Sequence, residues 1–126
     1  MGFFNGERIN AIGVTNDDEY KAKIMRSCDL LFYPSFADPC PNVVMEAMAC
    51  GLPVLYNPYG GVKEMVQPTE QIGGGVWIDY TEDFSHNVGC ILSHKEHLSK
   101  RALEISSEFT LERMVIEYIS AFKSVL

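Results

Sequence analysis

Basic residues are scarce in this 126-residue chain, because ten lysines and arginines face seventeen acidic residues and leave a formal net charge of −7. This balance excludes a broad basic surface for nucleic acid or anionic membranes, although local dipoles can still hold a small anionic ligand. No apolar run approaches the roughly 18 residues that span a bilayer. The N-terminal MGFFNGERIN lacks the basic and apolar regions of a signal peptide. We therefore expect no transmembrane segment, no signal peptide and no nucleic-acid partner.

The cysteines lack the C-x-x-C spacing of redox and zinc motifs. They stand separately at Cys28, Cys40, Cys50 and Cys90. We expect buried, reduced thiols in a cytoplasmic protein instead of a disulfide or a metal site. His94 and His97 have a spacing that metal ligands on a helix can show, but no cysteine or acidic cluster beside them completes a site. We expect them in a solvated helical turn, and no metal.

Strand-like and helical segments alternate along the chain. Apolar runs predict strands over residues 9–14, 29–35, 53–57 and 73–80. Helical patterns cover residues 15–28 and 41–51, a short turn from Gly60-Gly61 to Val66, and most of the last third. Such alternation implies parallel pairing and right-handed crossovers. We predict an α/β fold with a doubly wound, Rossmann-like parallel sheet followed by C-terminal helices, in a single domain over residues 1–126.

The first helix has a capping signal and a polar face. We expect Thr15 or Asn16 to be its N-cap, because both side chains can accept a hydrogen bond from the first turn. Tyr20, Ile24 and Cys28 recur at helical spacing and predict the inner face. Lys21, Lys23 and Arg26 should then point to solvent.

Residues near the C-terminus carry further local signals. We expect Trp77 in the core and the glycines at 73–75 in a flexible turn, because they lack the G-x-G-x-x-G pattern of a nucleotide loop. Residues 93–96 have the sequence of a capping box. Thr110 should cap a last amphipathic helix.

Three loops are expected at the edge of the sheet where ligands bind. In doubly wound sheets the ligand lies beyond the carboxyl ends of the strands, which selects residues 35–41, 57–61 and 80–83. The first two loops flank the helix over residues 41–51.

A single carboxylate, Glu46, stands in this otherwise apolar helix. At 100° per residue, Glu46 shares one stripe with Asn42 and Ala49, and Cys50 lies at its margin. The opposite face can pack on the sheet through Val44, Ala47 and Met48. From spacing alone, Glu46 is either a solvated glutamate or a residue that lines a cleft.

The start of this helix is a candidate anion site. Pro41 suits the first turn, where its missing N–H is no loss, and the N–H groups of Asn42 and Val43 point out of the helix. Asp38 lies eight positions before Glu46. Two acids around an anion-binding helix start can recognise a nucleotide diphosphate that carries a sugar, because carboxylates accept hydrogen bonds from hydroxyl groups.

The segment CDLLFYPSFADPCPNVVMEAMACGLPVLYNPYGGVKEMV resembles the donor-site signature of GT-B glycosyltransferases, in particular the retaining, nucleotide-sugar-dependent family 4. That signature has a strand ending in Pro-Ser, an acid, a glutamate eight positions later in Glu-Ala-Met-Ala-Cys-Gly, an apolar strand, and Gly-Gly followed by a glutamate. In this chain the elements are Pro34-Ser35, Asp38, Glu46 to Gly51, the run over residues 53–56, and Gly60-Gly61 with Glu64. Weaker similarity extends from about Ile9 to the end.

The resemblance implies a role for each matched residue. Glu46 would contact the ribose hydroxyls, and the backbone at Asn42 and Val43 would hold the diphosphate. Asp38 would contact the donor sugar near the reacting centre, as the catalytic acid of the set. The backbone at Gly60 and Gly61 would approach the donor closely, with Glu64 near the nucleotide or, alternatively, in solvent. The donor is a substrate, and no cofactor is implied.

This chain departs from the family pattern in two ways. The family normally has glutamate where this chain has Asp38, which is one methylene shorter. The acceptor domain and the first units of the donor domain, which usually supply an Arg and a Lys for the diphosphate, have no counterpart here; only Lys63 offers a basic side chain near the crevice.

The density of matched motifs argues against a generic doubly wound domain with no link to nucleotide sugars, which leaves two functions. The chain is the donor-binding portion of a glycosyltransferase, as a fragment or one half of a split enzyme, or it is a non-catalytic remnant that binds a nucleotide or a protein. The expected partners are a nucleotide sugar and either a separate acceptor-domain chain or a second copy. We also expect an exposed sheet edge or apolar patch near the N-terminus, because the resembled domain has further strands there.

Overall fold

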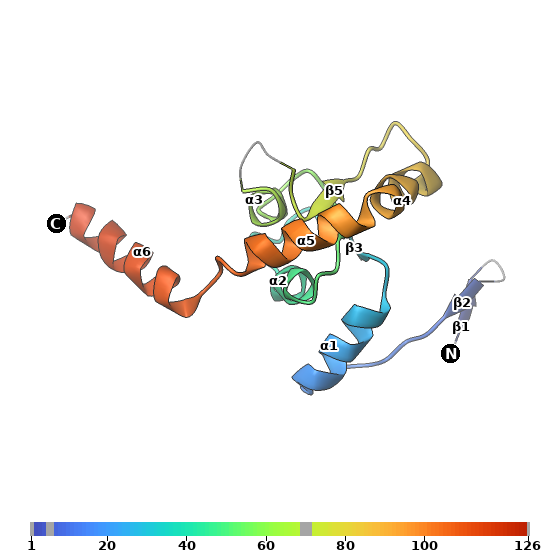
Figure 1. Cartoon of the computed structure of the whole chain (residues 1–126), viewed down its shortest axis with the longest axis horizontal. Helices are drawn as coiled ribbons and strands as arrows, with labels where there is room; N and C mark the ends of the chain where they lie inside the picture. Colours follow the sequence, from blue (N-terminus) through green and yellow to red (C-terminus); the bar gives the residue numbers. More distant parts are fainter. Residues whose placement is uncertain (1, 5–6, 69–71, 126) are drawn as a thin grey trace.

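The computed structural model describes residues 2–4, 7–68 and 72–125. Its strands are β1 (Gly2–Phe4), β2 (Glu7–Ile9), β3 (Leu31–Tyr33), β4 (Val54–Tyr56) and β5 (Gly75–Trp77). Its helices are α1 (Asp18–Ser27), α2 (Asn42–Ala49), α3 (Val62–Val66), α4 (Phe84–Ser93), α5 (Lys95–Ser106) and α6 (Leu111–Ser124). Figure 1 shows the helices α2 to α5 gathered around the strands β3 to β5, with α6 projecting away from them.

The central sheet is parallel, as predicted. Its order is β3-β4-β5, and Leu31 pairs with Val54, which in turn pairs with Gly75. Each connection contains a helix, which parallel neighbours require. The central strand β4 is fully buried because it has a strand on either side and helices on both faces.

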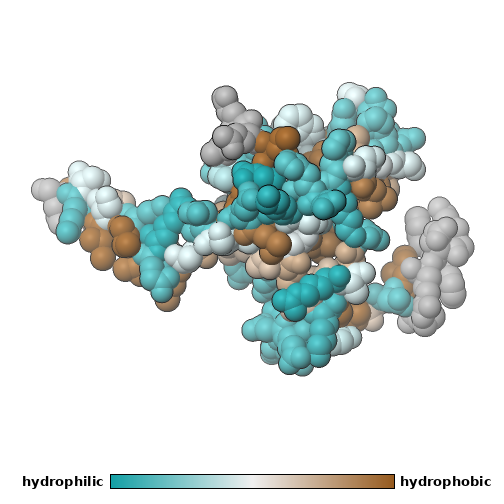
Figure 2. All heavy atoms as spheres, in the orientation of Figure 1, coloured by the Kyte–Doolittle hydropathy of each residue, from teal (hydrophilic) through white to brown (hydrophobic). Residues whose placement is uncertain are grey.

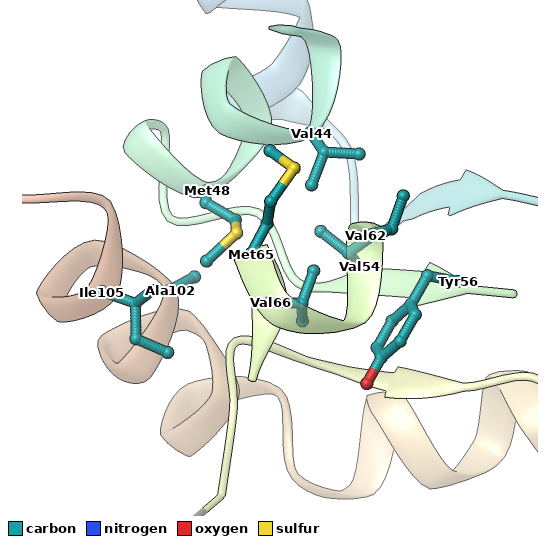
Figure 3. Packing of buried hydrophobic residues seen from close by; sticks show 9 residues of the cluster. All are labelled: Val44, Met48, Val54, Tyr56, Val62, Met65, Val66, Ala102 and Ile105. Atoms are coloured by element: carbon teal, nitrogen blue, oxygen red, sulfur yellow. The ribbon is translucent and has the colours of Figure 1, made fainter. Parts of the chain in front are cut away.

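The hydrophobic core lies on both faces of β4. Side chains alternate along a strand, so Val54 and Tyr56 face one side and Leu55 the other. Figure 3 shows the first cluster, where side chains from α2, α3 and α5 converge on Val54 and Tyr56. On the other face, Leu55 packs with Ile78, Ile91 and Leu98. The α/β, doubly wound architecture is therefore confirmed.

The face of α2 that packs on the sheet is the predicted one. Val44, Ala47 and Met48 are completely buried. Spacing of three and four residues was sufficient here because one whole helical stripe is apolar.

Glycines 73 to 75 are closely packed, so the prediction of a flexible turn is wrong. A Cβ on Gly75 would lie 2.0 Å from the carbonyl oxygen of Val54 in the neighbouring strand. A Cβ on Gly73 would lie 2.4 Å from the carbonyl oxygen of Val66. The chain needs glycine at these positions because backbone approaches backbone.

The predicted strand over residues 9–14 is also wrong. Only Ile9 belongs to a strand, β2, which pairs antiparallel with β1. Residues 10–14 have no regular structure, and Val14 is 99% exposed. A strand needs a paired neighbour, and this run finds none among the described strands.

The predicted N-cap of helix α1, Thr15 or Asn16, is wrong, because the observed cap lies one residue after the later of the two. Its N-cap is Asp17, whose carboxylate accepts a hydrogen bond from the N–H of Tyr20 at 3.0 Å. Thr15 instead accepts a hydrogen bond from the N–H of Asp17 at 3.1 Å. The predicted inner face is also wrong, because α1 has no buried residue and Tyr20 is exposed.

The two outer strands of the sheet expose large side chains. Trp77 on β5 is 49% exposed, so its predicted place in the core is wrong. Phe32 on β3 is exposed too, and its ring meets that of Phe84 edge-on at 5.1 Å. Among the described residues β3 has no strand on its outer side, which is the exposed sheet edge that was predicted near the N-terminus.

The C-terminal helices are capped differently from one another. Ser93 ends α4, where its hydroxyl donates to the carbonyl of Gly89, and His94 precedes α5 without a side-chain cap; the predicted capping box is therefore wrong. Thr110 caps α6, as predicted, by accepting from the N–H of Arg113 at 3.2 Å. Figure 2 shows hydrophobic side chains along α6, which has no buried residue. No helix within the described ranges has the length and apolarity to cross a membrane.

Candidate functional site

Asn57 joins the three loops at the carboxyl ends of the strands. Its side-chain amide donates to the carbonyl of Pro34 at 3.2 Å and to the hydroxyl of Tyr80 at 3.0 Å. Its side-chain oxygen accepts from the N–H of Tyr59 at 3.0 Å. Asn57 is fully buried, so its side chain depends on these protein partners for its hydrogen bonds. The loops after β3, β4 and β5 are thereby held as one unit.

Gly60 and Gly61 bring the second loop into contact with the first. Gly60 has φ +95°, and a Cβ there would lie 3.3 Å from the carbonyl oxygen of Phe36. At Gly61 a Cβ would lie 1.9 Å from the carbonyl oxygen of Pro39. Close backbone approach is therefore required at both glycines, and the partner that this structure supplies is the loop over residues 35–41. Their role toward a donor stays a prediction.

The carboxylate of Asp38 is held in place by two donors. Its Oδ2 accepts from the hydroxyl of Tyr33 at 2.8 Å, and its Oδ1 accepts from the N–H of Cys40 at 3.1 Å. Burial, and then the hydrogen bond to Asp38, raise the pKa of Tyr33, so Tyr33 remains a donor at neutral pH. Asp38 is thus oriented at the end of β3. Sequence reasoning missed Tyr33, whose only signal is its place in the strand just before the acid.

The start of α2 leaves backbone N–H groups available. Pro41 is the N-cap with an extended backbone, φ −71° and ψ 121°, and no side chain caps the helix. Helix geometry gives the N–H groups of Asn42 and Val43 no partner inside the helix. Asn42 is exposed, whereas the Val43 side chain packs against the core, so Val43 can offer a ligand only its amide.

Glu46 lines a small cavity between α1 and α2. The cavity measures about 260 Å³, and Ala49 and Cys50 share its wall with Glu46. This is the stripe that the helical spacing of α2 predicts. Glu46 therefore lines a cavity, which is one of the two alternatives that the spacing left open. It is neither buried in the core nor fully solvated.

Lys21 reaches into the same cavity. Its ammonium group lies 3.2 Å from Oε1 of Glu46 and 2.8 Å from Oδ1 of Asp18. Hydrogen bonds to Asp18 first and Glu46 second raise the pKa of Lys21. Lys21 was predicted to face solvent, and this is wrong: α1 turns Lys21 toward α2, and Tyr20 outward. The missed signal is the pair Ala22 and Met25, which line this cavity beside Lys21 and mark the face of α1 that is turned toward α2.

The other candidate residues lie apart from this cavity. Glu64 and Lys63 are exposed on α3, and their roles stay predictions. The four thiols form no disulfide, but Cys28 and Cys40 are exposed, and Cys90 and Cys50 (the latter in the cavity wall) are only half-buried, so the prediction of buried thiols is wrong. His94 and His97 are exposed, as predicted. Within the described residues no three His, Cys, Asp or Glu side chains are grouped to hold a metal.

Known proteins that resemble this chain are sugar-transferring enzymes. A glycosyltransferase of Methanocaldococcus jannaschii is 34% identical over 67 residues, which cover 53% of this chain and 16% of the relative. Glycogen synthase of Aquifex aeolicus is 25% identical over 86% of this chain and 25% of the enzyme. A D-inositol 3-phosphate glycosyltransferase of Geodermatophilus obscurus is 28% identical over 82% of this chain and 23% of the enzyme.

The chain thus spans a quarter or less of the length of these relatives. No solved structure matches the chain significantly. The sequence model of the family described as "Glycosyl transferases group 1" matches residues 3–105, which include β3, α2, β4 and all three loops at the carboxyl ends of the strands. The match covers most of the chain and every element that builds the site, and the chain accordingly belongs to the group 1 glycosyl transferases.

Proposed function

We propose that this chain is the donor-binding portion of a glycosyltransferase that transfers a sugar from a nucleotide-diphosphate sugar to an acceptor. The observation that carries the proposal is the position of Glu46, which lines a cavity on the helix whose free N-terminus follows Asp38. Membership of the group 1 family supports sugar transfer as the reaction. We place the protein in the cytoplasm, where nucleotide sugars are the donor substrates, and assign it no further cofactor.

Each residue of the site has a part in binding the donor. The amides of Asn42 and Val43 point out of α2, and the helix dipole adds positive potential for the diphosphate. Glu46 accepts hydrogen bonds from the ribose hydroxyls. Such charge-assisted bonds contribute roughly 1–3 kcal/mol, or about 5- to 150-fold in Kd.

Asp38 faces the donor sugar in this proposal. Both of its oxygens accept a hydrogen bond from the protein, one from Tyr33 and one from Cys40. A carboxylate has further lone pairs, so it can accept a sugar hydroxyl without breaking either contact. The fixed geometry favours a positioning role, in which a displacement of about 1 Å costs orders of magnitude in rate.

Lys21 modulates the ribose site. The ammonium group contacts Glu46 and would compete with a ribose hydroxyl for it, but it also brings positive charge close to α2. The pair is partly exposed, so screening by solvent keeps its own contribution to stability small. A donor can therefore displace or share Lys21 at low cost.

Titration calorimetry with uridine and guanosine diphosphates tests this proposal. We expect weak binding by the purified chain, because the basic residues usual in the family have no counterpart here. Glu46→Ala should weaken it by about 5- to 150-fold, and Glu46→Gln by less, because the amide still accepts one hydrogen bond. Glu112→Ala, which removes an exposed carboxylate in the first turn of α6, is the matched control. Equal affinity of wild type and Glu46→Ala would refute the role of Glu46.

A transfer assay tests whether this 126-residue chain catalyses sugar transfer by itself. We expect no turnover by this chain alone with uridine or guanosine diphosphate sugars, because positioning of acceptor against donor supplies as much as roughly 7–11 kcal/mol of barrier reduction. The partner that restores it is a separate chain with an acceptor-binding surface, or a second copy. Turnover by the isolated chain would contradict this part of the proposal.

A further inference from the structure

Three aromatic rings gather where the loops after β3, β4 and β5 meet. Phe36, Tyr59 and Tyr80 each come from a different loop. Phe36 lies between the other two, with its ring centre 6.2 Å from that of Tyr59 and 6.5 Å from that of Tyr80, and the planes differ by only 11° and 17°. The three residues are 64%, 63% and 57% exposed. Together they form an aromatic platform of these three residues.

The aromatic platform is preorganised from beneath. Asn57 donates to the Tyr80 hydroxyl and accepts from the Tyr59 N–H, so one buried side chain holds two of the three ring-bearing segments. Gly60 packs its backbone against the carbonyl of Phe36 and fixes the third. A ligand that stacks here therefore meets rings that are already in place, which lowers the entropic cost of binding.

We propose that the aromatic platform binds a pyranose ring, of either the donor or the acceptor, by stacking. The axial C–H groups of a pyranose form an apolar face that complements exposed aromatic faces, while its hydroxyls stay at the edge. Tyr80 supplies a polar contact: its hydroxyl oxygen accepts from Asn57, so its own proton is available for a sugar hydroxyl. That the pyranose takes part in sugar transfer rests on the function proposed above.

The location separates this site from the nucleoside site. The cavity at Glu46 is lined by residues of α1, α2 and the residue after α2, and no member of the aromatic platform contributes to it. The platform instead adjoins Asp38, since the backbone carbonyls of Phe36 and Asp38 both pack on Gly60. A sugar ring on the platform therefore lies on the Asp38 side of α2. Exposed apolar clusters of this kind commonly mark binding surfaces.

Nuclear magnetic resonance of the whole chain tests the aromatic platform. The probes are the methyl α-pyranosides of glucose, galactose and mannose, N-acetylglucosamine, UDP, and UDP-glucose, with ring signals of Phe and Tyr followed. We expect at least one free sugar to shift the platform rings saturably below about 50 mM, the weak range of single-ring stacking. Phe36→Ala and Tyr59→Ala should each weaken this binding at least about fivefold, whereas Tyr59→Phe, which keeps the ring, should stay within about twofold.

Controls separate the aromatic platform from surface stickiness. Phe122 is similarly exposed on α6, so Phe122→Ala should leave sugar binding unchanged. Circular dichroism spectra establish that each variant is folded, and two independent ring deletions keep the test valid if one of them unfolds. Absence of saturable binding by every sugar, unchanged binding in a folded Phe36→Ala or Tyr59→Ala variant, or displacement of the sugar from the rings by UDP would each overturn the proposal.

The two proposals fail in different ways. If UDP and GDP bind with dependence on Glu46 and no sugar reaches the platform rings, the aromatic platform alone is refuted. If sugars bind with dependence on Phe36 and neither diphosphate binds, the donor-binding function is refuted and the platform stands as a sugar site.

Discussion

Replacing Asn57 with alanine should destabilise the fold and loosen the site together. The side chain makes three hydrogen bonds, two donated and one accepted, and it is fully buried. Asn57→Ala removes all three and leaves a small cavity. The substitution does not force any helix or strand to move. The loss of stability should therefore be concentrated in the loops after β3, β4 and β5.

The magnitude follows from these contacts. Each hydrogen bond contributes about 0.5–1.5 kcal/mol net, but Pro34, Tyr59 and Tyr80 lie at the surface, where water can replace part of the loss. We expect Asn57→Ala to lower the free energy of unfolding by about 2–3 kcal/mol, a large share of the 5–15 kcal/mol typical of domains. Asn57→Asp should do at least as much damage at neutral pH, because a carboxylate cannot donate to the carbonyl of Pro34.

Urea unfolding followed by circular dichroism measures this effect. Asn16→Ala is the matched control, because Asn16 is exposed in the segment before α1 and should change the unfolding free energy by less than about 0.5 kcal/mol. If Asn57→Ala lies within that same margin, the three hydrogen bonds do not hold the loops and the reasoning fails.

Two further substitutions test the packing of the sheet. Gly75→Ala should destabilise the chain by more than about 3 kcal/mol, since its Cβ would lie 2.0 Å from the backbone oxygen of Val54. At Gly89 nothing lies within 4 Å of an added Cβ, so Gly89→Ala should stabilise α4 by up to about 1 kcal/mol. Thermal unfolding of the two variants and wild type measures both effects. Burial raises the pKa of Tyr56 to about 12, above the value of about 10 in an unfolded chain, so its contribution is fully present below pH 10 and is lost as pH rises toward 12. Tyr56→Phe should therefore lose stability less steeply than wild type between pH 10 and 12, and an identical dependence of the unfolding free energy on pH, measured by urea unfolding, would contradict this.

Local periodicity correctly predicted those helices and strands whose apolar residues all pack on the core. The spacing of Val44, Ala47 and Met48 predicted the buried face of α2, and the apolar run before Asn57 predicted the fully buried strand β4. The parallel sheet followed from alternation of strands and helices. These inferences need only the 3.6- and 2-residue periods and chain order.

Tertiary neighbours decided what the sequence could not predict. Tryptophan is a residue type that is usually buried, but Trp77 stands on the edge strand β5 and is half exposed. Lys21 is a surface residue by type, yet α1 lies so that its ammonium group meets Glu46, which is 25 positions away in the chain. Tyr33 and Asn57 act through loops that meet only in the folded chain. Motif similarity located Asp38 and Glu46, but not the residues that hold or neutralise them.

The last helix should be separable from the folded body. All of its residues from Leu111 to Ser124 are exposed, and Figure 1 shows α6 projecting from the other helices. Because no side chain of α6 enters the core, a chain ending at Phe109 should unfold within about 1 kcal/mol of the full chain. The apolar side chains exposed on α6 include Met114, Ile119 and Phe122.

Such an exposed apolar surface favours association with a second copy of the chain. Self-association, measured by sedimentation, is therefore a second test of this helix. The full chain should therefore sediment as a larger species at high concentration than the chain ending at Phe109. In the full chain Phe122→Glu should act like the truncation, and Ser120→Glu, at an exposed polar position of the same helix, should not. A fall of more than about 2 kcal/mol in the unfolding free energy on truncation, measured at low concentration, would mean that α6 packs on the body of the same molecule.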